Sequence, residues 1–341
     1  MTVPLPIAGA LTELGPNGSR VLLLAASRDP DAKITALFGT ASGAGLVCKV
    51  PTTEVARDAV RRERDALTWL RHEALDGLGS TVPRRITDVA GLAAVEPPLE
   101  VLVSTRVPGR PMSVGYHRWR HTARRRPVVA DVQGALGWLE SLWSVTRGEA
   151  APFTWADEVA AELSLRYDAG TPGLRTALDQ LTGAHKLLAA HSCPRTVVHG
   201  DFWFGNVMVR DGAVTGVVDW EGADRRGWPL RDVARFLLSY SLYLDRHTGA
   251  GRAVPRHPGL RRGQNASTLP YALLGDGWYP DLVRARLVRA LDLLGLPAEL
   301  WYAVALTGLG EVAARANHDQ FGHDHLQVLA ALPSRAEVHE P

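Results

Sequence analysis

Short apolar runs separated by turn-forming residues fill the amino-terminal part of the chain. The runs at 19–27, 33–40 and 46–50 are joined by Arg-Asp-Pro-Asp and Ala-Ser-Gly-Ala-Gly, so the pattern predicts an antiparallel meander. Apolar positions at 55–72 then recur at helical spacing among charged residues, which is typical of an amphipathic helix seated on a sheet. A further strand of the buried type is predicted at 100–105.

Helical periodicity takes over after Pro108-Gly109, which interrupts the strand pattern. Asp211-Gly212 separates two short apolar runs, and this arrangement predicts a β-hairpin. Residues 245–280 are rich in Gly, Pro, Arg and His and show little periodicity, so we expect an irregular insertion or a lid there. The other elements predicted beyond the breaker are helices at 131–146, 155–167, 174–191 and from 232 onward, and a strand at 195–198.

The length of 341 residues exceeds the size at which one hydrophobic core stops growing, which favours two lobes with a binding cleft between them. The 46% hydrophobic and 22% charged residues are typical of a globular protein and argue against a disordered chain. No apolar stretch reaches the ~18 residues that a membrane span needs. Residues 1–14 lack the features of a signal peptide, and Cys48 and Cys193 are the only cysteines. We therefore expect a cytoplasmic protein without a membrane partner.

The net charge of +2 gives no overall reason to expect binding to nucleic acid. Five arginines between 118 and 126 form a local basic run, which we interpret as a solvated face. The alternative, a nucleic-acid-binding surface, predicts binding that weakens steeply with salt. Lysine, in contrast, occurs only at positions 33, 49 and 186, so a well-placed lysine is noticeable.

The most informative segment is His-Gly-Asp-Phe-Trp-Phe-Gly-Asn-Val-Met-Val at 199–209, followed by Val-Val-Asp-Trp-Glu at 217–221. These residues resemble the aminoglycoside phosphotransferase and choline kinase family, the small-molecule relatives of the protein kinases. The resemblance implies an α+β, two-lobed protein-kinase-like fold. The N-lobe, residues 1–106, would be a small antiparallel sheet of five strands with one helix, and would bind the nucleotide. The larger, mainly helical C-lobe, residues 107–341, would carry the catalytic loop, the metal site and the acceptor site.

The motif carries oxygen-bearing side chains at the spacing that phosphoryl transfer needs. That reaction needs an acceptor hydroxyl aligned with the γ-phosphate, and cations that neutralise charge on the phosphate oxygens. By the resemblance, Asp201 orients and deprotonates the hydroxyl, while Asn206 and Asp219 bind Mg²⁺, a cation that prefers oxygen ligands. Asp232 resembles the family's aspartate that braces the catalytic loop, and a plain helix cap is the alternative for it.

The nucleotide-binding residues are assigned by the same resemblance. Lys49 would contact the α- and β-phosphates, Val47 would pack against the adenine, and Glu63 would hold Lys49 by an ion pair. The strand end at Ser104 and Arg106 resembles the hinge whose backbone reads the adenine edge.

The chain departs from the family pattern between its first two strands. Residues 27–32 contain no glycine where relatives often place a small-residue flap over the phosphates, so the choice between ATP and GTP stays open. Arg28 is a candidate phosphate contact in its place. Glu221 and Asp224 follow the metal ligand and could face a cationic acceptor or simply lie at the surface.

The resulting hypothesis is a kinase that moves the γ-phosphate of ATP or GTP to a hydroxyl of a small molecule, with an antibiotic or natural product as the first candidate. The alternative is a nucleotide-binding pseudokinase with a regulatory or scaffolding role. We expect a monomer or a homodimer. The histidines and aspartates at 318–325 fit no established metal-ligand spacing, and we expect a solvated helix end there.

Overall fold

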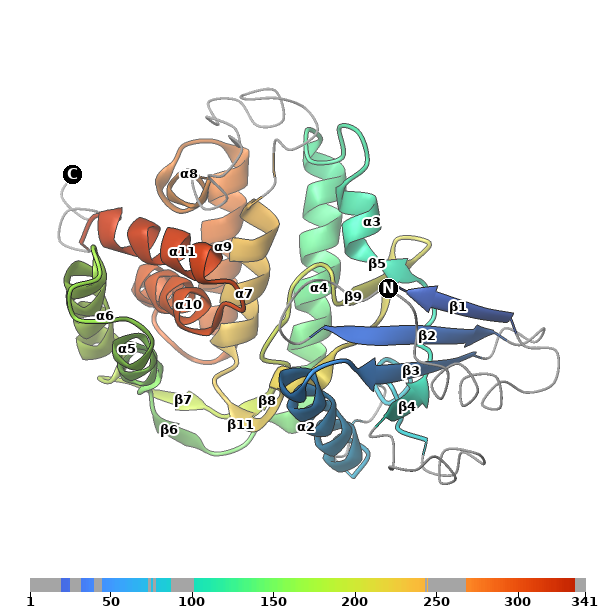
Figure 1. Cartoon of the computed structure of the whole chain (residues 1–341). Coiled ribbons are helices and arrows are strands. Elements are labelled where there is room, and N and C mark those ends of the chain that lie inside the picture. The colour runs from blue at the N-terminus through green and yellow to red at the C-terminus, as the bar shows by residue number, and fades with distance from the viewer. Residues whose placement is uncertain are drawn as a thin grey trace. The chain divides into compact units, whose positions relative to one another are not determined.

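The computed structural model divides into two compact units (Figure 1). The first unit comprises Met1–Gly109 and Thr215–Ala223, and the second comprises Arg110–Val214 and Asp224–Pro341. The residues described are 20–24, 32–39, 45–72, 75, 78–86, 101–242, 244 and 268–334. No helix in this described part of the chain combines the length and apolar character that crossing a membrane requires.

The first unit is built on a four-stranded sheet of order β1-β2-β3-β4 in which every neighbouring pair is antiparallel. Its strands are β1 (Arg20–Leu24), β2 (Lys33–Gly39), β3 (Gly45–Pro51) and β4 (Leu102–Thr105). Side chains of β2, β3 and β4 form a core of Ile34, Ala36, Phe38, Cys48, Val50 and Val103. Because Cys48 points into this core, its neighbours Val47 and Lys49 lie on the opposite face of β3.

Helix α2 (Glu54–Leu70) packs against β3 and β4. It begins at Thr53, whose side chain accepts a hydrogen bond from the amide of Ala56 at 3.0 Å. Its buried residues recur every three or four positions, as the amphipathic pattern predicts. Glu63 is the charged member of that buried face, with only 2% of its surface exposed.

The segment Thr215–Ala223 belongs to the first unit although it follows the catalytic motif in sequence. The amide of Val217 donates to the carbonyl of Thr81 at 2.9 Å. Gly216 has a φ of +156°, and a Cβ there would lie 2.1 Å from the oxygen of Thr81, so only glycine fits this approach. The short helix η2 (Trp220–Gly222) packs against α2.

The second unit is mainly helical and is organised around α10, which neighbouring helices bury on several sides (Figure 1). Gly308 and Gly310 allow these close approaches, because a Cβ at Gly308 would lie 2.4 Å from the Cβ of Ala234. The helices are α3 (Met112–Tyr116), α4 (Arg125–Thr146), α5 (Trp155–Arg166), α6 (Leu174–Leu188), α7 (Leu230–Ser241), α8 (Leu269–Leu274), α9 (Trp278–Leu293), η3 (Ala298–Leu300), α10 (Trp301–Arg315) and α11 (Asp319–Ala331).

Short strands connect these helices and flank the motif at 199–209. One sheet has the order β10-β9-β5, and two further pairs join β11 to β8 and β6 to β7. Their bounds are β5 (Arg110–Pro111), β6 (Ala150–Pro152), β7 (Ser192–Pro194), β8 (Thr196–Val198), β9 (Val207–Arg210), β10 (Ala213–Val217) and β11 (Asp224–Gly227). The predicted hairpin around Asp211-Gly212 is therefore present, with Asp211 at a φ of +53° and Gly212 at +81°.

Several elements differ from the sequence predictions. Helix α4 begins at Arg125 rather than at 131, because a proline at position 127 is tolerated in a first helical turn. Within the segment 245–280, which we expected to be irregular, 269–274 and 278–280 are helical, and 245–267 include no described residue. The described part of the first unit contains four strands and an isolated bridge between Arg85 and Ser104 in place of five strands.

The two charged segments that we expected to be solvated, at 118–126 and 318–325, differ in their exposure. The arginines between 118 and 126 are exposed, in agreement with a solvated face. The expectation of a solvated helix end at 318–325 is wrong for His325, which is 1% exposed in α11. Helical periodicity explains the burial, because Gly322, His325, Leu326 and Leu329 share the inward face of α11.

Candidate active site

The loop that the resemblance predicts to be catalytic begins at His199, directly after β8, and is hydrogen-bonded to the start of α7. The buried carboxylate of Asp232 accepts the amide of His199 at 2.6 Å and that of Gly200 at 2.9 Å. Burial raises the pKa of Asp232, while His199, Arg231 and the two amide hydrogen bonds act in the opposite direction. The geometry matches the bracing function that the resemblance implied for this residue.

Asp201 is held by two side chains, one on each carboxylate oxygen. Arg235 of α7 places Nε at 3.0 Å and Nη2 at 2.9 Å from Oδ1 of Asp201. The amide nitrogen of Asn206 lies 3.2 Å from Oδ2 and 3.0 Å from the backbone oxygen of Asp201. These bonds use the amide nitrogen of Asn206, so its amide oxygen is the atom suited to ligate a cation.

Two aromatic residues of the loop stack on rings of neighbouring helices. Phe202 stacks on Trp138 with ring centroids 5.8 Å apart, and Phe204 stacks on Tyr116 at 4.4 Å. The loop's glycine at 205 leaves room for the indole ring of residue 203, because a Cβ there would lie 2.3 Å from that ring in its present position. The loop backbone is therefore fixed by buried rings, while 38% of the Asp201 side chain stays exposed.

In the first unit, Lys49 joins Glu63 and Asp219. Its Nζ lies 2.7 and 2.6 Å from the two carboxylate oxygens of Glu63 and 2.7 Å from Oδ1 of Asp219. Burial opposes the charge on Lys49, but the carboxylates of Asp219 and Glu63 outweigh it and raise the lysine pKa. The ion pair between Lys49 and Glu63 that the resemblance implied is present.

Asp219 has a left-handed backbone, with a φ of 72° and a ψ of 63°. A non-glycine residue adopts this conformation at an energetic cost, and such strain concentrates at functional sites. The conformation is set at the junction between β10 and η2, where the chain turns sharply.

Lys33 is a residue of this cluster that sequence reasoning did not assign. Its ammonium group is hydrogen-bonded to Oε2 of Glu221 and lies 3.8 Å from Oδ1 of Asp219. Burial and the neighbouring Asp219 raise the pKa of Glu221 to about 7, while Lys33 acts in the opposite direction. The scarcity of lysine in the sequence was the available signal, because two of the three lysines meet at Asp219.

The cluster has the donor chemistry that Mg²⁺ requires. Glu63, Asp219 and Glu221 each offer a carboxylate oxygen, and these atoms lie within 4.8 Å of one another. Oxygen ligands in small number suit Mg²⁺, which keeps several waters and shares phosphate oxygens. The residues of the first unit therefore fit a divalent cation at Asp219.

The remaining candidate residues are less decisive. Val47 pairs with Ser104 across β3 and β4, and the amide of Arg106 donates to the carbonyl of Gly45 at 2.9 Å. The Arg106 amide is thus already hydrogen-bonded within the first unit. Asp224 is exposed and accepts the amide of Arg226 at 2.9 Å. Arg28 lies outside the described residues.

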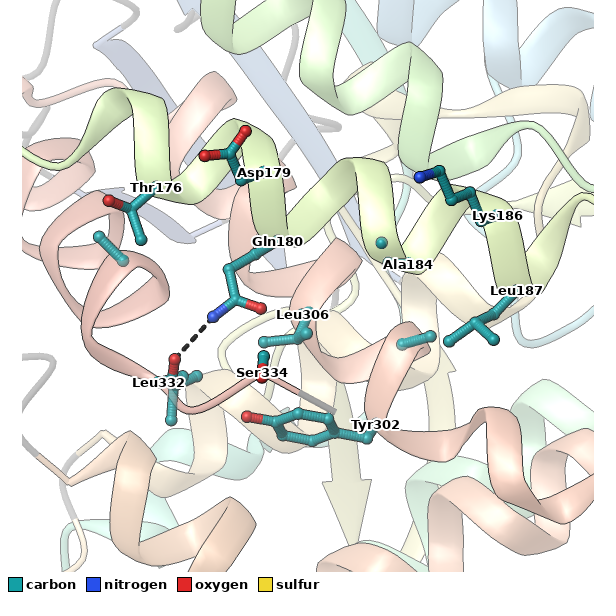
Figure 2. Close-up of a pocket in the computed structure, with 13 residues that line it drawn as sticks. Thr176, Asp179, Gln180, Ala184, Lys186, Leu187, Tyr302, Leu306, Leu332 and Ser334 are labelled. Carbon is teal, nitrogen blue, oxygen red and sulfur yellow. Dashed lines mark hydrogen bonds between the residues drawn. The ribbon is translucent and has the colours of Figure 1, made fainter. Parts of the chain in front are cut away.

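The second unit contains a cavity away from the catalytic loop. The cavity, of about 850 Å³, lies between α6, α10 and the residues after α11 (Figure 2), and none of its lining residues belongs to that loop. Gln180 crosses it to donate a hydrogen bond to the carbonyl of Leu332 at 2.7 Å.

Neither cysteine has the properties of a catalytic thiol. Both are buried, and burial raises the pKa of each thiol to about 12. Because the thiolate is the nucleophilic form, neither Cys48 nor Cys193 is suited to nucleophilic catalysis.

Comparisons with known proteins identify the family of the chain. Residues 34–264, more than half of the chain, match the model of the phosphotransferase enzyme family known as APH, and the chain belongs to this family. No curated protein sequence matches the chain significantly.

Solved structures of aminoglycoside phosphotransferases share the fold. The crystal structure of APH(4)-Ia has a TM-score of 0.57 at 16% identity and covers 96% of this chain and 99% of its own. A thermostable mutant of APH(4)-Ia, in a ternary complex with AMP-PNP and hygromycin B, has a TM-score of 0.56 at 16% identity. That match covers 96% of this chain and 98% of the mutant's chain. The predicted fold class, α+β and two-lobed like the protein kinases, is confirmed.

Proposed function

We propose that this protein transfers the γ-phosphate of ATP or GTP to a hydroxyl group of a small molecule. Asp201 is the residue that orients the acceptor and takes its proton, and Asn206 and Asp219 hold Mg²⁺. Lys49, positioned by Glu63, contacts the α- and β-phosphates. Membership of the phosphotransferase enzyme family supports the reaction class.

The observation that carries the proposal is the way Asp201 is held. Arg235 binds one of its carboxylate oxygens and Asn206 the other, so the side chain has a defined orientation. The brace from Asp232 fixes the start of the loop that bears it. A carboxylate held in this way can accept the proton of a hydroxyl aligned for attack, which is worth ~10²-fold to 10⁴-fold in rate.

Mg²⁺, when bound, supplies positive charge to the phosphate oxygens of the nucleotide. The amide oxygen of Asn206 and the carboxylate of Asp219 are the proposed ligands, and the carboxylate of Glu221 lies close enough to Asp219 to join them. Lys49 keeps its positive charge, because two carboxylates surround it, and this charge suits the phosphates. Val47 would pack against the base, with the strand end at Ser104 and Arg106 as the hinge.

Hydroxylated antibiotics and natural products are the first acceptor class to test. APH(4)-Ia, which shares the fold, was crystallised with hygromycin B and an ATP analogue, and this supports the choice. The paired state of Glu221 and Lys33 means that Glu221 is not free to face a cationic acceptor. A cytoplasmic monomer or homodimer remains our expectation for the protein.

The direct test is an acceptor screen with purified protein. Mg-ATP and Mg-GTP are supplied in parallel with a panel of aminoglycosides, macrolides, peptide antibiotics, choline and sugars, and each product is analysed by mass spectrometry. We expect one acceptor class to gain a single phosphoryl group. Nucleotide binding without transfer to any acceptor, and without release of phosphate, would instead support the pseudokinase alternative.

A further inference from the structure

Two of the three lysines of this chain meet at one oxygen. Lys49 and Lys33 approach Oδ1 of Asp219 at 2.7 and 3.8 Å, so their ammonium nitrogens lie at most about 6.5 Å apart. Lys33 also pairs with Glu221. The side chains of Lys33 and Lys49 are largely buried, at 11% and 14% exposed respectively. Water therefore screens the charges of this cluster poorly.

The charges of the cluster do not balance. Three carboxylates, those of Glu63, Asp219 and Glu221, face the two ammonium groups, which leaves one excess negative charge when all are ionised. A divalent cation on the Asp219 and Glu221 oxygens would reverse the sign of the cluster. The ammonium group of Lys33 would then have lost its partners and would face a site that attracts anions.

The position of Lys33 suits a phosphate contact. It is the first residue of β2 and directly follows residues 27–32, whose sequence contains no glycine to let backbone amides approach a phosphate closely. A lysine is a compact point charge on a flexible stem, so it can exchange a carboxylate for a phosphate by rotating its side chain. The chain uses arginine for almost all of its other cations, since only three of its 38 basic residues are lysine.

We propose that Lys33 is a second phosphate-binding lysine, which pairs with Asp219 and Glu221 until a divalent cation takes their oxygens and then binds the nucleotide's phosphates. This inference rests on the proposed function, because it assumes that a magnesium nucleotide binds at Lys49 and Asp219. It accounts for how the phosphates are covered without a glycine-rich flap. A static ion pair that only stabilises the first unit is the competing explanation.

The exchange can be followed in the wild-type chain by acetylation of lysines and peptide mass spectrometry. Lys186 is the internal reference, because it is exposed and lines the separate cavity of Figure 2. We expect Mg²⁺ alone to increase acetylation of Lys33, and Mg-ATP to reduce it below the metal-only level, with Lys186 constant. Equal acetylation of Lys33 under all three conditions would overturn the proposal.

The variant Lys33→Gln gives a second readout, with Lys186→Gln as the matched control. Without the Lys33 ammonium group, Mn²⁺ binding measured by electron paramagnetic resonance should become tighter. Binding of Mg-ATP by calorimetry should weaken about tenfold, while AMP binding stays unchanged. A static ion pair predicts changes of Mn²⁺ and Mg-ATP affinity in the same direction, or none.

These experiments distinguish failure of the proposed function from failure of the role of Lys33. If wild-type protein binds no Mg-ATP, the proposed function fails and this inference fails with it. If wild type binds Mg-ATP and Lys33→Gln binds it equally well, only the role of Lys33 is overturned. Thermal unfolding of the variant shows whether it folds, and the acetylation experiment needs no variant.

Discussion

Arg235 binds Asp201 through a single oxygen: its Nε and Nη2 lie 3.0 and 2.9 Å from Oδ1. Arg235 comes from α7, the same helix whose Asp232 accepts the amides of His199 and Gly200. One helix therefore fixes both the backbone at the start of the catalytic loop and the side chain of the proposed base.

Replacing Arg235 with Gln should lower the rate constant of transfer rather than nucleotide affinity. The guanidinium group orients Asp201, and a displaced catalytic group loses ~10- to 100-fold in rate. We expect kcat to fall by about this factor while the KM for ATP changes little, which steady-state kinetics would show. Arg235→Lys should recover part of the loss. A variant of Arg289, whose pair with Asp292 is exposed, serves as the control, and equal losses in both variants would contradict the assignment.

Removing the Asp232 carboxylate should destabilise the second unit. In Asp232→Ala the buried amide of His199 and the half-buried amide of Gly200 would lose their acceptor, at a cost of ~2–5 kcal/mol in the free energy of unfolding. Urea denaturation of wild type and variant measures this difference. A loss below ~1 kcal/mol would mean that the loop is fixed by its aromatic packing instead.

Glu63→Gln should weaken nucleotide binding. The glutamine side chain is neutral, so Lys49 would keep only Asp219 as an anionic partner and would lose the contact that holds it over the sheet. We expect the Kd for Mg-ATP to rise about tenfold, measured by calorimetry. Glu54→Gln, which changes an exposed glutamate of the same helix, should leave the Kd unchanged. Unaltered affinity in Glu63→Gln would reduce the buried ion pair to a structural role.

Acid should destabilise the chain partly through His325. Burial lowers its pKa from 6.5 to about 4, and Arg235 acts in the same direction, while Phe321 and Asp324 oppose it. The folded chain resists the proton that the unfolded chain binds, so this contribution to stability is complete above pH 6.5 and is lost as the pH falls towards 4. The loss amounts to at most ~3 kcal/mol.

His325→Phe keeps an aromatic ring at this buried position and cannot titrate. Urea denaturation from about pH 7 to about pH 4 should show the wild type losing stability relative to the variant as the pH falls. Parallel curves for the two proteins would show that the imidazole is not responsible.

The catalytic motif and the strands around it could be recognised in the sequence because their local signals are strong. The hairpin at Asp211-Gly212 has the turn residues that a tight reversal demands, and both adopt positive φ. Lys49 and Glu63 could be paired in advance through the family resemblance, and the ion pair is present in the structure.

Pairs of residues distant in the sequence could not be predicted from it. Lys33 and Glu221 are 188 positions apart in the sequence, and Arg235 and Asp201 are 34 apart, so no local sequence pattern predicts either pair. The burial of His325 on the inward face of α11 likewise depends on the helices packed around it, which the histidine and aspartate content of the segment does not reveal.

The most direct measurement of the central claim compares wild type with Asp201→Asn. Transfer of the γ-phosphate from Mg-ATP to the acceptor found by the screen, or to water, is followed with labelled nucleotide, and nucleotide binding is measured in parallel. The account predicts that the variant binds Mg-ATP like the wild type but transfers phosphate at least ~10²-fold more slowly. Equal transfer by both proteins, or none by the wild type, would contradict it.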